Sequence, residues 1–119
     1  MNMVVRSRGS VQYATCESTD DVIRNPQDML DLMAFAGEHG TNLVLLNEKN
    51  FNEAFYDLST GLAGEIAQKL FNYRTRLAVV GTFKSVHSQR FREFMYETNK
   101  GRQLMFASDE PSAIAWLSQ

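Results

Sequence analysis

Apolar residues in the first third of the chain occur in two short segments and then at helical spacing. The segments at 4–8 and 11–16 flank Gly9-Ser10, which is typical of a β-hairpin whose two-residue turn has glycine at its first central position. Asn25-Pro26 then supplies an N-cap and a residue suited to the first helical position. The spacing that follows predicts a helix ending at Gly40, with one buried face formed by Met29, Leu32, Met33 and Ala36.

The rest of the chain alternates between short apolar runs and amphipathic segments. The apolar runs predict strands at 43–46, 77–80 and 103–107, and the four aliphatic residues of the first predict burial on both faces. The amphipathic segments predict helices at 62–73, 88–99 and from 108 onward, with Tyr73 on the buried face of the first. The order ββαβαβαβα predicts one α/β domain over residues 1–119, a mixed, mostly parallel sheet covered by helices.

Composition narrows the class of protein. The chain has 119 residues, 44% hydrophobic and 22% charged, which is typical of a globular domain able to bury a core. No apolar run approaches the roughly 20 residues that span a bilayer, so we expect no membrane association. The single cysteine, Cys16, excludes an internal disulfide, and the first residues do not resemble a secretion signal. Both features predict a cytoplasmic location.

Charge is distributed unevenly along the chain. The formal net charge is −2, but residues 1–66 carry −6 and residues 67–119 carry +4. The bases of the second half are interleaved with acids, so the pattern does not predict nucleic-acid binding. Solvated helix faces and a polar surface for a protein partner both fit this pattern.

In an α/β sheet, sites gather in the loops at the carboxyl ends of the strands. The loop after the strand at 43–46 carries the carboxylates of Glu48, Glu53 and Asp57. Paired carboxylates perform acid–base catalysis when burial separates their pKa values, whereas solvated acids and acids bonded to loop amides are structural. Both interpretations stay open, and a ligand site here would also include Glu65, with Arg92 holding an anion.

The segment 59–64, Ser-Thr-Gly-Leu-Ala-Gly, places two hydroxyls at the predicted start of a helix. A hydroxyl in this position is an N-cap, or else the unpaired amides and the positive end of the dipole attract a phosphate. A phosphate on Ser59 or Thr60 would add up to two negative charges beside Asp57 and repel an acidic partner. The spacing is not that of a P-loop.

Metal and nucleophile chemistry have little support in the sequence. His39 and His87 are far apart, and no Cys/His or His-x-x-x-His spacing occurs. Cys16 on an early strand is more typical of a small core residue than of a nucleophile. We therefore expect neither a metal nor a cofactor.

Four long stretches, at 55–66, 68–73, 77–81 and 92–101, carry a resemblance to a known family. In them the chain resembles an uncharacterised bacterial family, domain of unknown function 4180, over essentially its whole length. This resemblance implies no activity.

A wider resemblance is to STAS domains, the sulfate-transporter and anti-sigma-factor-antagonist fold. Their signature, Asp-Ser-Ser-Gly-Leu-Gly, follows the central strand. With Leu58 as an inserted residue, Asp57, Ser59, Thr60 and Gly61 are similar to its first four positions. The resemblance implies a partner-binding module switched by phosphorylation, with Thr60 in place of the phosphorylated serine.

Two hypotheses from different classes result. The first is a cytoplasmic, STAS-like interaction module without catalytic activity, whose partner-binding or phosphorylation surface comprises Asp57, Ser59, Thr60, Gly61 and Gly64. The second is a small-molecule site or enzyme that uses the acidic loop from Glu48 to Asp57. A homodimer is a further possibility for the partner.

Overall fold

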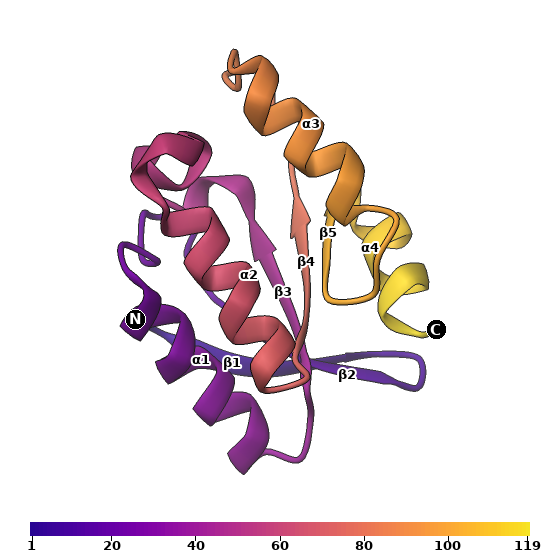
Figure 1. Ribbon diagram of the computed structural model, residues 1–119. Helices are drawn as coiled ribbons and strands as arrows, with labels where there is room; N and C mark the ends of the chain where they lie inside the picture. Colours follow the sequence, from indigo (N-terminus) through magenta and orange to yellow (C-terminus); the bar gives the residue numbers. More distant parts are fainter.

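The computed structural model describes residues 1–119 and contains one five-stranded sheet with four helices (Figure 1). The strands are β1 (Met3–Arg8), β2 (Val11–Cys16), β3 (Leu43–Asn47), β4 (Arg76–Val80) and β5 (Leu104–Ala107). The helices are α1 (Pro26–Glu38), α2 (Leu62–Asn72), α3 (Gln89–Thr98) and α4 (Glu110–Leu117). The predicted α/β class is confirmed. None of the helices is both long and apolar enough to span a bilayer.

The strands lie in the sheet in the order in which they occur along the chain. β1 is antiparallel to β2, and β2, β3, β4 and β5 are mutually parallel, so the sheet is mixed and mostly parallel as predicted. The hairpin of β1 and β2 has its turn at Gly9, whose φ is 62°. The hairpin joins β3 through one pair, Ala14 with Val44, and runs across the direction of β3–β5 (Figure 1).

Helix α1 begins and ends where the sequence predicts. The Asn25 side chain accepts a hydrogen bond of 2.9 Å from the amide of Asp28, and Pro26 occupies the first turn. Its four predicted core residues are all buried. Beyond the helix, Gly40 takes a φ of 79° and reverses the chain toward β3.

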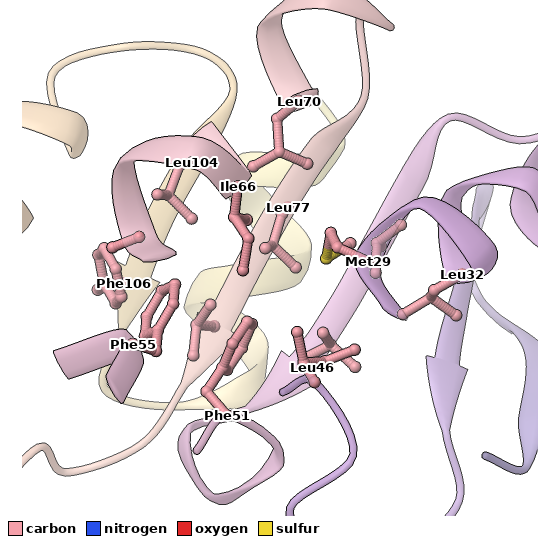
Figure 2. Packing of buried hydrophobic residues seen from close by; sticks show 14 of the residues in the cluster. Met29, Leu32, Leu46, Phe51, Phe55, Ile66, Leu70, Leu77, Leu104 and Phe106 are labelled. Atoms are coloured by element: carbon pink, nitrogen blue, oxygen red, sulfur yellow. The ribbon is translucent and has the colours of Figure 1, made fainter. Parts of the chain in front are cut away.

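One face of the sheet is covered by α1, α2 and α3, which form the larger core with it (Figure 2). Leu77 of β4 lies beside Ile66 of α2, Leu46 of β3 lies near Phe51, and Phe55 lies next to Phe106 of β5. The prediction for Tyr73 is wrong: α2 ends at Asn72, and Tyr73 is 64% exposed. Its backbone leaves the helical conformation, so its side chain no longer follows the buried face.

The opposite face of the sheet is covered by α4, which also packs on the part of the hairpin nearest its turn. Val11 and Tyr13 of β2 pack with Trp116 and its neighbours on α4. This second layer is incomplete, so Leu43 and Leu45 of β3 are only half-buried. The predicted burial of residues 43–46 on both faces is therefore wrong for these two leucines.

Arg76 of β4 secures the end of α4 from inside this second layer. It is 9% exposed, and its guanidinium lies 4.2 Å from the centre of the Trp116 ring. It donates hydrogen bonds to the carbonyls of Trp116, Leu117 and Gln119, at 3.0–3.2 Å. A cation on the last carbonyls of a helix is also favoured by the helix dipole. Burial lowers the pKa of the guanidinium.

The free edge of β5 is closed by a side chain. Asn99, at the end of α3, donates to the carbonyl of Phe106 at 3.2 Å and accepts from its amide at 2.8 Å. A carboxamide in this position replaces the backbone of a further strand. It satisfies the amide and the carbonyl of Phe106 and so hinders another chain from pairing there.

Candidate functional site

The candidate site lies at the carboxyl ends of β3 and β4, where two loops meet. The first loop consists of three short 3-10 turns: η1 (Glu48–Asn50), η2 (Glu53–Tyr56) and η3 (Leu58–Thr60). Each turn is capped by a short polar side chain, which accepts from the amide two residues further on at 2.8–3.0 Å. These caps are Asn47, Asn52 and Asp57. Their five-residue spacing is the sequence signal for this ordered loop, which the polar composition alone did not reveal.

Asn50 anchors the loop from below. It is 1% exposed, and its side-chain oxygen accepts from the amide of Asn47 at 2.9 Å. Its side-chain NH2 donates to the carbonyls of Ser18 and Asp20, at 2.9 and 3.0 Å. The segment between β2 and α1 is thereby tied to the loop after β3.

Glu48 joins this loop to the loop after β4. One of its carboxylate oxygens accepts from the amides of Thr82 and Phe83, at 3.0 and 3.3 Å. Its side chain crosses directly over Gly81, where a Cβ atom would lie 2.6 Å from the carboxyl carbon. A side chain at position 81 would therefore force the Glu48 side chain to move. The structural interpretation of Glu48, an acid bonded to loop amides, is what the structure shows.

Tyr56 closes the base of the site. Its hydroxyl donates to the carbonyl of Glu48 at 2.5 Å, and its ring meets those of Phe55 and Phe91 edge-on. Burial raises the pKa of Tyr56 well above its usual range, and the nearby Glu48 carboxylate raises it further. Tyr56 therefore stays protonated as a hydrogen-bond donor and does not act as a base at neutral pH.

A hollow of about 380 Å³ opens between the two loops. Its lining residues are Glu48, Lys49, Phe51, Glu53, Tyr56, Thr82, Lys84 and Ser85. A second hollow of about 290 Å³ shares three of these residues and adds Asp57, Val86 and His87. We call the two together the edge groove. Its rim carries both lysine ammonium groups and carboxylates, and its floor is partly aromatic.

Of the acidic set proposed from sequence, Glu48, Glu53 and Asp57 line the edge groove, whereas Glu65 and Arg92 do not. Glu65 is exposed on the first turn of α2, above Gly61. Arg92 donates to the carbonyl of Val86 at 2.6 Å from α3, so it braces the loop after β4.

The second predicted surface forms a projecting turn next to the groove. Asp57, Ser59 and Thr60 are exposed. One oxygen of Asp57 accepts from the hydroxyl of Ser59 at 2.7 Å and from its amide at 3.0 Å. These bonds, the hydroxyl bond foremost, lower the pKa of Asp57.

The Thr60 hydroxyl is fully engaged within the turn. Its single proton is shared between the carbonyls of Ala54 and Asp57, at 2.6 and 2.8 Å, and its oxygen accepts from the amide of Leu62 at 3.3 Å. It thus ties η2, η3 and the start of α2 together.

The helix begins at Leu62, as predicted, but the expectation that Ser59 or Thr60 is its N-cap is wrong. Both residues lie in η3, and the N-cap of α2 is Gly61, whose φ is 82° and which supplies no side-chain cap. The left-handed backbone at Gly61 separates the two helical segments, because a residue with a Cβ atom rarely adopts it. Gly64 lies exposed on the first turn of α2, and nothing within 4 Å would meet a Cβ there.

Groups suited to a metal do not converge in the chain. No three His, Cys, Asp or Glu side chains come close enough to hold an ion. His87 lines the edge groove, whereas His39 follows α1 and its Nδ1 lies 2.9 Å from the carbonyl of Phe35. Cys16 is buried in the larger core, and burial raises the pKa of its thiol. It is a core residue and not an activated nucleophile.

Comparison with known proteins gives one match. The model of a family described as "Domain of unknown function (DUF4180)" matches residues 8–117. No curated protein matches the chain. No solved structure matches it either.

Proposed function

The chain is a member of this family, DUF4180, and we propose that it is a cytoplasmic, STAS-like protein-interaction module without catalytic activity. Its docking surface is the projecting turn formed by Asp57, Ser59, Thr60 and Gly61, with Gly64 beside it. Phosphorylation of Ser59 or Thr60 switches this surface. The observation that carries the proposal is the bonding of Thr60: an exposed residue whose hydroxyl holds the turn together.

The position of the turn in the fold supports the STAS-like assignment. β3 is the central strand of five, and the turn leads from its loop into α2. The STAS signature occupies the same junction after the central strand. The single cysteine, buried and unpaired, supports a reducing compartment.

A phosphate on Thr60 would rebuild the turn as well as add charge. The esterified oxygen has no proton, so both bonds to the carbonyls of Ala54 and Asp57 would be lost. The phosphate would also lie among these carbonyl oxygens and near the Asp57 carboxylate, and like partial charges repel. Modification of this one residue would therefore change both the shape and the charge of the docking surface.

Ser59 offers a second route to the same change. Its hydroxyl and amide both bond the Asp57 carboxylate, which caps η3. A phosphate on Ser59 would lie next to the Asp57 carboxylate, in place of the hydrogen bond between the two side chains. The two negative groups would repel each other, so the cap of η3 would open. The two candidate residues thus act on one structural unit.

The test compares capture of partners by the wild-type chain, Thr60→Glu and Ser10→Glu. Ser10 is exposed at the hairpin tip and receives the same charge far from the turn along the chain. We expect the wild type and Ser10→Glu to recover the same proteins, and Thr60→Glu to lose them while its melting temperature shows that it folds. Equal recovery by Thr60→Glu would overturn the switch. Mass spectrometry of the protein from its own cells must also find phosphate on Ser59 or Thr60.

The edge groove favours a second candidate function, a small-molecule site. Glu53 and Asp57 line one hollow, Glu48 and Glu53 the other, and Lys49 and Lys84 lie on the rim. This mixture of charges suits a small zwitterion or an anion. A ligand at one hundred times its dissociation constant stabilises the fold by about 2.7 kcal/mol, so a thermal-shift screen detects it. A ligand whose shift disappears in Lys84→Ala would favour the groove over the turn.

A further inference from the structure

The outer edge of β1 is a row of unpaired backbone groups. Arg8 and Val11 flank the two-residue turn, so they form a hydrogen-bonded pair, and the ladder alternates from there. The bond from the amide of Glu17 to the carbonyl of Asn2, at 3.0 Å, continues this series. The amides and carbonyls of the alternate residues Met3, Val5 and Ser7 therefore point away from β2.

Nothing else in the chain bonds these outward groups. No loop, helix or side chain donates to or accepts from the backbone of Met3, Val5 or Ser7. The opposite edge of the sheet differs, because the Asn99 carboxamide closes β5. The β5 edge is thus blocked at Phe106, whereas the β1 edge is open along its length.

We infer that β1 pairs with β1 of a second copy of this chain, antiparallel and centred on Val5. This register places the Val5 residues opposite each other and Met3 opposite Ser7 of the second copy. It uses every outward group of β1 and forms up to about six backbone hydrogen bonds. A register centred on Val4 leaves the outward groups of Ser7 without a partner in β1. A register centred on Arg6 does the same to Met3 and also places the two Arg6 residues directly opposite each other. The proposal is independent of the docking turn.

Side chains agree with the Val5-centred register. Arg6 lies opposite Val4 of the second copy, so its aliphatic stem covers a half-buried valine. The two Arg6 side chains are diagonal neighbours, at about 7–8 Å between Cα atoms, and repel moderately. Like charges are not directly opposite anywhere in the paired strands. The dimer is therefore expected to tighten as salt screens the Arg6 pair.

Ser7→Pro against Ser7→Ala tests the pairing. Ser7 is exposed, and its amide takes no part in the hairpin, so proline removes only the outward donor while alanine keeps it. The wild type and Ser7→Ala should sediment at twice 13.5 kDa at the upper end of a series from about 1 µM to 1 mM. Ser7→Pro, with two bonds fewer per dimer, should dissociate about 30-fold more readily. Matching melting temperatures would show that both variants fold.

Residue-resolved amide exchange identifies the interface itself. Exchange of the Val5 and Ser7 amides should slow as the protein concentration rises, while the Val4 and Arg6 amides, already bonded in the hairpin, should not change. A wild-type monomer at about 1 mM would overturn the inference. So would a dimer that Ser7→Pro leaves intact, or one in which Val5 and Ser7 exchange freely. Protection of these amides only by an added peptide would assign the edge to another partner.

Discussion

Replacing Asn50 by alanine tests whether the loop of the candidate site depends on one buried side chain. The substitution removes three hydrogen bonds, of 2.9, 2.9 and 3.0 Å, to Asn47, Ser18 and Asp20. Each neutral bond contributes about 1 kcal/mol net, so the free energy of unfolding should fall by about 3 kcal/mol. For a domain of this size that corresponds to a melting temperature lower by about 12 °C.

Asn52 provides the matched control. It lies in the same loop, and its side chain makes one bond, of 2.8 Å, to the amide of Ala54. Asn52→Ala should therefore lower the melting temperature by about 4 °C. Calorimetry on both variants separates the anchor from an ordinary turn cap. An Asn50→Ala melting temperature within about 4 °C of the Asn52→Ala value would refute the reasoning.

Asn50→Asp adds a chemical signature to the same experiment. The volume is preserved, but an ionised carboxylate would face the carbonyls of Ser18 and Asp20 with no proton to donate. This variant should be less stable than Asn50→Ala at neutral pH. The folded structure would raise the pKa of the new carboxyl above its value in the unfolded chain. The loss of stability caused by its charge should therefore be absent below the pKa of the unfolded chain and should appear as the pH rises above it. Parallel curves for the two variants from pH 4 to 7 would contradict this account.

Three further predictions follow from single contacts. Gly81→Ala should lower the free energy of unfolding by about 1–3 kcal/mol in chemical denaturation, because its Cβ would overlap the Glu48 side chain. Asn99→Ala should cost about 1–2 kcal/mol and open the β5 edge, which light scattering would register as concentration-dependent association. Ser59→Ala should raise the pKa of Asp57 toward 3.8, followed by NMR titration, because the hydroxyl bond is the main cause of its lowering. The lowered pKa stabilises the folded state at pH values above the usual pKa of Asp57, and this stabilisation is lost as the pH falls through the pKa of the folded state. The wild type should therefore lose more stability on acidification than Ser59→Ala.

Elements with local causes could be predicted from the sequence. The hairpin depends on Gly9 at its turn, and α1 on the cap at Asn25 and a regular apolar spacing. The location of the candidate site could also be predicted, because carboxyl ends of parallel strands share one edge. Errors occurred where a backbone change interrupts a pattern: Gly61 separates η3 from α2, and Tyr73 lies past the end of its helix.

Features that depend on distant residues could not be predicted. The importance of Asn50 depends on two carbonyls about 30 residues earlier in the chain, and no spacing marks them. Arg76, a charged residue next to an apolar run, gives no sign in the sequence that its guanidinium binds the end of α4. The same holds for Glu65 and Arg92, which do not line the groove because of how α2 and α3 pack.

The second layer of the core is built from the two most widely separated parts of the chain. Arg8 pairs with Glu110 at 2.7 Å, and Arg76 holds the carbonyl of Gln119. During synthesis, the hairpin leaves the ribosome before α4, so Val11 and Tyr13 stay uncovered until α4 has emerged. The larger core can close once β5 has emerged, whereas the second layer needs α4 as well, because Trp116 is the residue that covers the hairpin.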